Sequence, residues 1–205
     1  MIPLSDLLDI CREDEGYRED YLICLYQHAI KLPPYSILVE IGCYRGLSTL
    51  MLAAAVKDKN SLICTIDPIF RTGELTYPNI EDNQSMTLQS SLEEVKKWWK
   101  SALGEPPIII MADYSWDVLR RWMIPIDFLL IDGEHTKSAV MRDMAWSKFI
   151  KPGCDILLDD WFDKVQDGAR EYLLSHPELT IIHESTAPPE GDMLLTLIRK
   201  HEGTL

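Results

Sequence analysis

The chain has 205 residues, the size of one domain, and 46% of them are hydrophobic, which indicates a globular protein with a sizeable core. It carries 20 Lys and Arg against 33 Asp and Glu, a net charge of −13 that argues against a nucleic-acid partner and an anionic membrane surface. No apolar run approaches the roughly 18 residues that a membrane-spanning helix needs.

The first thirty residues are predicted to be helical. Apolar side chains recur every three or four residues over 4–11 and again over 17–28, and Pro33 and Pro34 end this pattern. We therefore expect an N-terminal helical cap over residues 1–34, which could cover a site or form a dimer contact. The main domain is expected over residues 35–205.

Short apolar runs alternate with helical segments after the prolines. The runs predict strands over residues 37–41, 62–67, 108–111, 127–131, 155–158, 179–183 and 193–198. The segments between them predict helices over residues 48–57, 91–103, 116–122, 137–150 and 165–175. Pro152-Gly153 is expected to turn the chain into the fifth strand.

Continuously apolar strands that alternate with helices are typical of a parallel sheet covered on both faces. The last two predicted strands follow each other without a helix. We therefore expect a Rossmann-like, doubly wound α/β fold, whose seven-stranded, mostly parallel sheet ends in an antiparallel strand pair.

The five cysteines are odd in number, widely spaced and mostly in apolar surroundings, and they form no CxxC motif. This usage is typical of reduced core residues in a cytoplasmic protein. The first residues also lack the basic region and apolar core of a signal peptide, which favours the same compartment.

An acidic residue stands at or just after the carboxyl end of each of the first five predicted strands. Ligands of a doubly wound sheet bind beyond the carboxyl ends of its strands, so these acids are candidate site residues. They are Glu40, Asp67, Asp113, Asp132 and the pair Asp159-Asp160.

The first strand leads into the segment Glu40-Ile41-Gly42-Cys43-Tyr44-Arg45-Gly46-Leu47-Ser48. Gly42 and Gly46 permit a tight turn and a close approach to a ligand at the start of a helix. Tyr44 stands where a GxGxxG dinucleotide motif has its middle glycine, which disfavours a nicotinamide cofactor. A plain strand-to-helix turn with no ligand is the alternative.

This segment resembles the cofactor loop of class I S-adenosylmethionine-dependent methyltransferases, and the resemblance spans residues 36–199. It implies that Asp67 binds the ribose hydroxyls and that Asp113 borders the adenine. A turn or helix-capping role is the alternative for Asp67. The implied cofactor-binding residues are Glu40, Gly42, Gly46, Ser48, Asp67, Asp113 and Ser115.

The segment Ile131-Asp132-Gly133-Glu134-His135, followed by a helix and Asp159-Asp160-Trp161, resembles the metal-dependent O-methyltransferases. The branch that acts on macrolide sugars, its cephalosporin hydroxylase-like relatives and, more distantly, catechol O-methyltransferase share this arrangement. The resemblance implies that Asp132, Asp159 and Asp160 bind Mg²⁺ or another divalent cation.

Mg²⁺ prefers oxygen ligands, and neighbouring parallel strands bring their ends within reach of one ion. Consecutive strand residues point to opposite faces, so Asp159 and Asp160 can share a metal only if the strand ends there. The alternative is that Asp160 or Asp163 caps the next helix.

His135 is the candidate general base, since it follows Asp132 by three residues, where relatives of the catechol type carry a lysine. A histidine of ordinary pKa can accept a proton at neutral pH. Asp132 itself is the other candidate base, and a local helix-start hydrogen bond is the alternative role of His135.

Residues 68–89 are polar and long for a connection, and they are expected to form a substrate lid. Arg71, Tyr77 and Trp161 are candidates to line an acceptor pocket, with simple loop packing as the alternative.

Together these features favour an S-adenosylmethionine-dependent, Mg²⁺-assisted O-methyltransferase acting on a hydroxyl of a small molecule, of sugar or phenol type. We expect neither a nucleic-acid nor a membrane partner, and a homo-oligomer is left open. The main alternative is a non-catalytic cofactor-binding or partner protein with the same fold. A nicotinamide oxidoreductase or a metal-dependent hydrolase is a further alternative.

Overall fold

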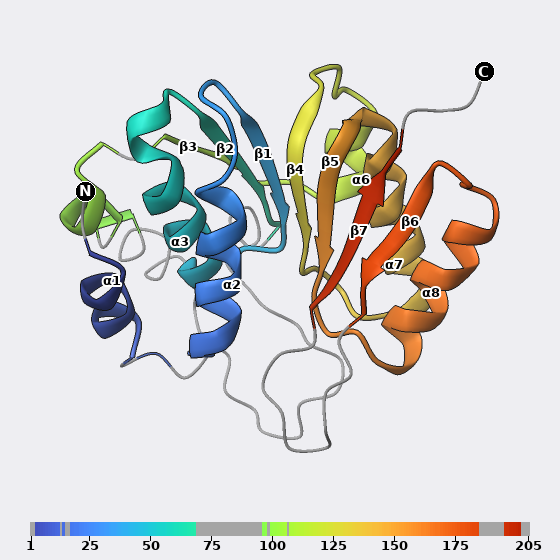
Figure 1. Ribbon diagram of the computed structural model, residues 1–205, viewed down its shortest axis with the longest axis horizontal. Coiled ribbons are helices and arrows are strands. Elements are labelled where there is room, and N and C mark those ends of the chain that lie inside the picture. The colour runs from blue at the N-terminus through green and yellow to red at the C-terminus, as the bar shows by residue number, and fades with distance from the viewer. Residues whose placement is uncertain are drawn as a thin grey trace.

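The structure is a computed structural model that describes residues 3–12, 14, 17–68, 96–97, 99–105, 107–184 and 195–201. Within these residues the strands form a seven-stranded sheet in the order β3-β2-β1-β4-β5-β7-β6 (Figure 1). Neighbouring strands from β3 to β5 are parallel, whereas β7 runs antiparallel to both β5 and β6. The predicted Rossmann-like doubly wound sheet is confirmed.

The strands follow the predicted apolar runs closely. They are β1 (Ile37–Ile41), β2 (Leu62–Ile66), β3 (Ile108–Met111), β4 (Ile126–Ile131), β5 (Ile150–Leu158), β6 (Leu179–His183) and β7 (Thr196–Lys200). The α-helices are α1 (Leu4–Cys11), α2 (Glu19–Ala29), α3 (Leu47–Val56), α6 (Ser115–Leu119), α7 (Lys137–Met144) and α8 (Asp163–Leu174). Short 3-10 helices cover Lys57–Lys59 and Ala145–Phe149, and residues 96–97 and 99–103 are also helical.

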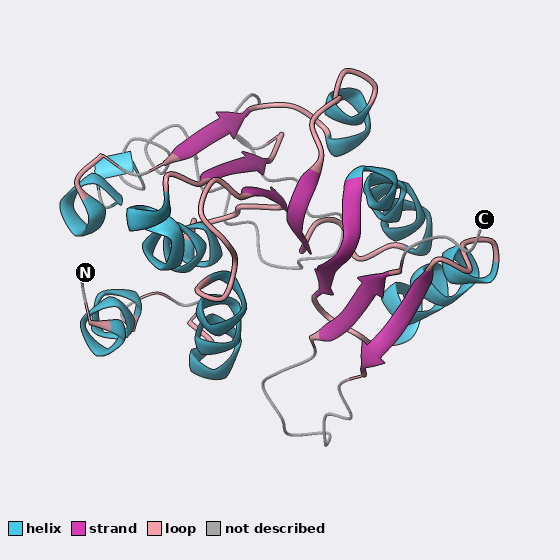
Figure 2. Ribbon diagram, turned by 45° about the horizontal axis from the view of Figure 1, so that its top comes forward, coloured by secondary structure: helices cyan, strands magenta, loops and turns pink. Residues whose placement is uncertain are grey.

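Helices cover both faces of the sheet, as the continuously apolar strands predict (Figure 2). On one face α1, α2 and α3 pack with Leu38 and Phe128 of the central strands. On the other face α6, α7 and α8 pack with Val39 and Leu129. Successive residues of one strand thus enter opposite cores, which is the period-two geometry of a pleated strand.

The N-terminal helices share the first of these cores. Leu7, Leu22 and Leu25 are almost completely buried beside Leu50 of α3. Burial of such side chains contributes about 1.5–3 kcal/mol each, so α2 is held firmly against the main domain. This packing fixes where the start of α2 lies relative to the sheet.

Several predicted boundaries differ from the structure. The helix expected to reach residue 150 ends at Met144, and a 3-10 turn carries the chain into β5. Strand β5 then begins at Ile150 and passes through Pro152-Gly153, because Ile150 already pairs with Ile126 before a register shift. Pro152-Gly153 is therefore part of an irregular strand and does not form a separate turn.

Helix α6 is shorter than predicted and begins one residue earlier, at Ser115. Strand β7 runs to Lys200, two residues past its predicted end, because Lys200 pairs with Leu179 of β6. The predicted lid lies almost wholly outside the described residues, together with Arg71 and Tyr77 and residues 91–95 of the predicted helix.

All five cysteines are unpaired, as their spacing predicts. Among the described helices, none combines the length and the apolar character that crossing a bilayer requires.

Candidate active site

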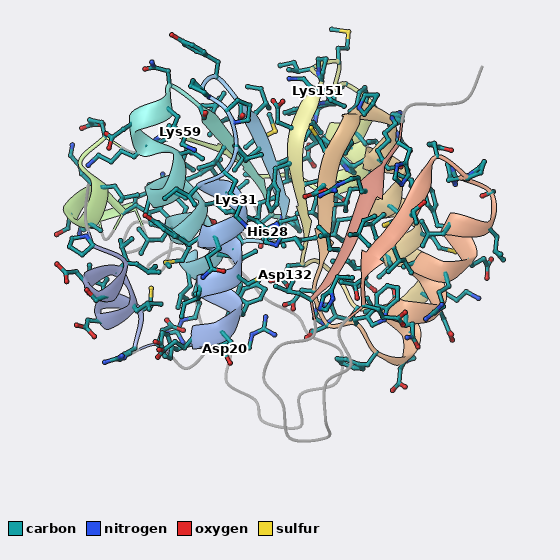
Figure 3. All side chains as sticks on the ribbon, in the orientation of Figure 1. Asp20, His28, Lys31, Lys59, Asp132 and Lys151 are labelled. Carbon is teal, nitrogen blue, oxygen red and sulfur yellow. The ribbon has the colours of Figure 1, made fainter. Side chains whose placement is uncertain are left out.

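The carboxyl ends of β1, β4 and β5 meet at one edge of the sheet. Asp132 lies at this edge, whereas Lys59 and Lys151 lie toward the opposite end of the strands (Figure 3). A cavity of about 250 Å³ opens there. It is lined by Arg18, Tyr21, Leu22, Gly42, Cys43, Tyr44, Arg45, Leu47, Ser48, Asp132, Gly133, His135, Asp159 and Asp160.

The glycines of the β1–α3 loop serve two different purposes. Gly42 has a φ of +89°, and a Cβ atom built on it would lie 1.9 Å from the carbonyl oxygen of Asp132. Gly46 has a φ of +81° and starts α3 in the left-handed conformation. In the structure Gly42 is close to the backbone of the loop after β4, whereas its predicted close approach to a ligand stays a prediction.

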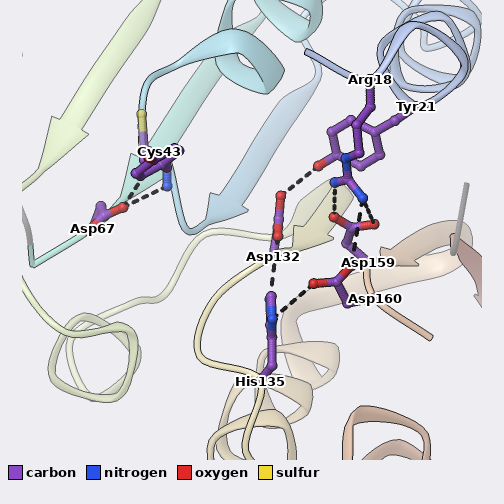
Figure 4. Close-up of polar contacts among 9 residues, drawn as sticks. Arg18, Tyr21, Cys43, Asp67, Asp132, His135, Asp159 and Asp160 are labelled. Atoms are coloured by element: carbon purple, nitrogen blue, oxygen red, sulfur yellow. Dashed lines mark hydrogen bonds and ion pairs between the residues drawn. The ribbon is translucent and has the colours of Figure 1, made fainter. Parts of the chain in front are cut away.

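Asp67 fixes the conformation of this loop from the end of β2. Its Oδ2 atom accepts hydrogen bonds from the backbone N–H groups of Cys43, at 2.8 Å, and Tyr44, at 3.0 Å (Figure 4). Tyr44 adopts a φ of +46°, so the loop holds a non-glycine residue in the left-handed region. Asp67 thus holds the peptide groups of this turn, which is the alternative role given to it, while its binding of ribose hydroxyls stays a prediction.

Glu40 is fully buried behind the loop and does not line the cavity. Thr49 of α3 donates a hydrogen bond to its Oε2 atom, while Oε1 has no hydrogen-bond partner. Burial raises the pKa of Glu40 to about 7, against the lowering effect of the neighbouring Ser48 and Thr49 hydroxyls. Ser48 does line the cavity.

The predicted adenine-side residues follow β3. Asp113 accepts a hydrogen bond from Arg121 at 2.9 Å. Ser115 is buried and donates its hydroxyl proton to Asp143 of α7. Neither Asp113 nor Ser115 lines the cavity.

Asp159 and Asp160 point into the same site even though they are consecutive. Strand β5 ends at Leu158, and Asp160 takes a left-handed φ of +52°, so the chain turns between the two carboxylates. The alternative that Asp160 or Asp163 caps α8 is wrong, because the N-cap residue of this helix is Phe162 and no side-chain hydrogen bond caps it.

Two residues of the N-terminal region complete this cluster. Arg18, just before α2, contacts both oxygens of Asp159, one of them at 3.4 Å, and lies 3.6 Å from Oδ1 of Asp160. Tyr21 donates its hydroxyl proton to Oδ2 of Asp132 at 2.7 Å, and the Arg18 guanidinium stacks 4.2 Å from the Tyr21 ring. Figure 4 shows these contacts.

Sequence reasoning missed Arg18 and Tyr21, which belong to no motif. Arg18 is 141 residues from Asp159, and Tyr21 is 111 residues from Asp132. The only available signal is that three clustered carboxylates require a cation nearby. That requirement does not say which arginine of the chain supplies it.

His135 connects two of the acids. Its Nδ1 atom is 2.9 Å from Oδ2 of Asp160, and its Nε2 atom is 3.7 Å from Oδ1 of Asp132. The contacts with Asp132 and Asp160 raise the pKa of His135 to about 10, although burial opposes the charge. His135 is therefore an imidazolium at neutral pH and does more than form a local helix-start hydrogen bond.

The pKa values of the consecutive acids Asp159 and Asp160 are shifted in opposite directions. Burial and the neighbouring Asp132 raise the pKa of Asp159 to about 7, although Arg18 favours the carboxylate. Burial also disfavours charge at Asp160, but the hydrogen bond and charge of His135, with Arg18, lower the pKa of Asp160 below its usual value. Asp160 is the firmly ionised member of the pair.

The carboxylates have the donor chemistry that Mg²⁺ prefers, but they are engaged by other groups. Among the described residues, no group of three or more His, Cys, Asp and Glu side chains is arranged to hold a metal ion. With Arg18 bound to Asp159, the residues as they stand do not fit a resident divalent cation.

Trp161 lies beside the site but does not line the cavity. Its side chain is 3% exposed, and its indole N–H donates to Glu184 at 2.8 Å. Trp161, which was a candidate to line an acceptor pocket, is instead packed in the connection between β5 and α8.

The family comparison agrees with this arrangement of loop and acids. Residues 39–161 match a family described as a methyltransferase domain, and the match contains the β1–α3 loop and all three clustered acids. The chain belongs to this family of methyltransferase domains. The class of enzyme indicated by the sequence is therefore confirmed.

Solved structures of methyltransferases share the fold. An O-methyltransferase named TomG from Streptomyces achromogenes, involved in tomaymycin synthesis and solved with S-adenosylmethionine, is 18% identical at a TM-score of 0.67, over 97% of this chain and 89% of that one. An O-methyltransferase from Bacillus cereus, solved with S-adenosylhomocysteine, is 15% identical at a TM-score of 0.67, over 98% and 93%.

A structure described as a putative rRNA methylase from Clostridium thermocellum is also similar. It is 10% identical at a TM-score of 0.63, over 89% of this chain and 96% of that one. The fold is thus shared by proteins described with different methyl acceptors, and the acceptor must be argued from the site itself.

Proposed function

We propose that this chain is an S-adenosylmethionine-dependent O-methyltransferase that acts on a hydroxyl group of a small molecule, of sugar or phenol type. One observation carries the proposal. The glycine loop after β1 and the Asp132–His135–Asp160 cluster after β4 and β5 line the same cavity, so a methyl donor and a proton acceptor would face one another.

The methyl donor would lie along the β1–α3 loop, with Gly42 and Ser48 at the cavity and Asp67 and Glu40 holding the loop from behind. S-adenosylmethionine, when bound, supplies an electrophilic sulfonium methyl group. Gly46, Asp113 and Ser115 remain predicted cofactor residues. The two O-methyltransferases solved with this cofactor or its product support the assignment.

The proton acceptor in this proposal is Asp132. His135 carries its own proton at neutral pH, because Asp132 and Asp160 raise its pKa, so it stabilises the neighbouring carboxylate charge. A hydroxyl becomes strongly acidic as its oxygen bonds to the methyl carbon, and a carboxylate is then basic enough to take the proton. Positioning of the two reactants supplies most of the remaining rate.

Mg²⁺ assistance stays a prediction from the resemblance. It requires Asp132, Asp159 and Asp160 to bind the ion, and Arg18 would first have to leave Asp159. The proposed mechanism has no step that depends on the ion.

A small-molecule acceptor suits the charges of the site better than RNA does. The chain has a net charge of −13, and the three carboxylates that line its cavity face the cations Arg18, Arg45 and His135, so the lining is not strongly basic. A phosphodiester backbone needs a basic surface for binding, whereas a neutral sugar or phenol does not.

The test measures cofactor binding and methyl transfer separately. Calorimetric titration with S-adenosylhomocysteine comes first, followed by transfer of labelled methyl from S-adenosylmethionine to a panel of sugars and phenols. We expect Asp132→Asn to keep its affinity for S-adenosylhomocysteine while turnover falls by about 10²–10⁴-fold. Asp67→Asn should weaken cofactor binding.

Glu105→Gln is the matched control, because the Glu105 side chain is 86% exposed and does not line the cavity. Cofactor binding without transfer to any hydroxyl would favour the non-catalytic partner protein. No binding of the cofactor at all would overturn the proposal.

A further inference from the structure

Arg18 occupies a special position among the clustered acids. Its guanidinium contacts both oxygens of Asp159, whose side chain is 1% exposed, and lies 3.6 Å from Asp160. A carboxylate so deeply buried is costly unless a cation accompanies it. The planar fork of arginine matches a carboxylate with two N–H groups, which a lysine cannot do.

Every oxygen of the three carboxylates faces a group of the chain itself. Asp132 has Tyr21 at Oδ2 and His135 near Oδ1. Asp159 has Arg18 at both oxygens. Asp160 has Arg18 near Oδ1 and His135 at Oδ2. The carboxylate oxygens that would coordinate an ion therefore already face Arg18, Tyr21 or His135.

We infer that Arg18 is the built-in cation of this site, so that a divalent cation binds to Asp159 and its neighbours only when Arg18 is displaced. A divalent cation would need the same Asp159 oxygens at about 2.0–2.6 Å, and two cations that share one carboxylate repel each other. The inference concerns cation binding alone and goes beyond the proposed methyl transfer.

The fold explains how Arg18 reaches the acids. Arg18 is the residue that precedes α2, in an extended conformation, and Tyr21 follows within the first turn of that helix. Helix α2 is held against α3 by the buried side chains of Leu22 and Leu25. Tyr21 keeps the guanidinium in place by stacking 4.2 Å from it, so docking of α2 delivers the cation.

The test is Mn²⁺ binding to the full chain, measured by electron paramagnetic resonance without cofactor or acceptor. We expect Arg18→Gln to bind Mn²⁺ about tenfold or more tightly than the wild type, because it leaves Asp159 without its cation beside Asp132 and Asp160. The double variant Arg18→Gln with Asp159→Asn should lose that gain. Arg18→Lys should gain less affinity than Arg18→Gln, because it keeps the charge although it lacks the two-N–H fork.

Arg12→Gln is the matched control, since it removes one arginine from a surface ion pair with Asp9 and should leave Mn²⁺ binding unchanged. Tight Mn²⁺ binding by the wild type that Asp159→Asn abolishes would overturn the inference, as would an Arg18→Gln variant that gains no affinity.

Folding of the Arg18→Gln variant is checked by circular dichroism. If it is unfolded without metal, recovery of the native signal on adding Mn²⁺ supports the inference, and no recovery contradicts it. None of these readings depends on methyl transfer. A failed inference therefore leaves the proposed function standing, and a failed activity assay leaves Arg18 as the resident cation.

Discussion

The two halves of the site are built in different ways. In the half formed by β1, β2 and α3, Asp67 and Glu40 bond groups within a short stretch of chain, and much of the bonding is to backbone N–H groups. In the half formed by β4, β5 and the start of α2, charged side chains from distant segments meet. Hydrogen bonds between residues at most 24 positions apart shape the first half, whereas contacts across more than a hundred residues complete the second.

The largest expected effect is at Gly42, which joins the two halves. Gly42→Ala places a Cβ atom 1.9 Å from the Asp132 carbonyl oxygen at a left-handed φ, and we expect it to cost about 3–5 kcal/mol of unfolding free energy. Urea denaturation measures this. Gly153→Ala has a similar φ of +82° but open space around it, and should cost about 1–2 kcal/mol. Equal losses in the two variants would show that the close contact is unimportant.

The next largest effect is a pH dependence of stability that comes from Glu40, in the half of the site formed by β1, β2 and α3. The pKa of Glu40 is raised to about 7 in the folded chain from 4.5, so the folded state binds this proton more tightly than the unfolded state. Stability from this group is present below pH 4.5 and is lost as the pH rises to about 7, by about 3 kcal/mol.

Glu40→Gln should remove that part of the slope when unfolding free energy is measured across this pH range. Glu105→Gln should leave the slope unchanged, because its side chain is 86% exposed. A wild-type slope that survives Glu40→Gln would assign the pH dependence to the acid cluster instead.

Tyr21→Phe probes the half that depends on the remote helix. It removes the hydroxyl that donates to Asp132 at 2.7 Å, and a lost hydrogen bond to a carboxylate should cost about 1.5–3 kcal/mol. Chemical denaturation provides the value. Tyr35→Phe is the control, since Tyr35 is 73% exposed and should change stability by less than about 0.5 kcal/mol.

The smallest expected effect is at Asp67. Asp67→Asn keeps an oxygen that can accept from Cys43 and Tyr44 but loses the charge, which should cost about 1 kcal/mol of stability. Denaturation measures this loss, and Mn²⁺ binding by an Arg18→Gln background should be unaffected. A change in Mn²⁺ affinity would mean that the two halves are coupled more tightly than their contacts indicate.

The sheet and its edge acids could be predicted from the sequence because their signals are local. Continuous apolar runs mark strands such as β1 and β4, and a doubly wound sheet puts Asp67 and Asp132 at one edge. Boundaries such as the start of β5 could not, because the pairing of Ile150 with Ile126 depends on register.

By itself, the sequence determined the fold, the glycine loop and the gathering of Asp132, Asp159 and Asp160 at the carboxyl edge of the sheet. Only the tertiary structure decided which cation meets those acids. Arg18 and Tyr21 lie more than a hundred residues from these acids in the sequence, and they reach them because α2 packs on α3. The tertiary structure also determines the pKa of His135, because Asp132 and Asp160 raise it through their positions in space. The spacing of residues along the chain does not give those distances.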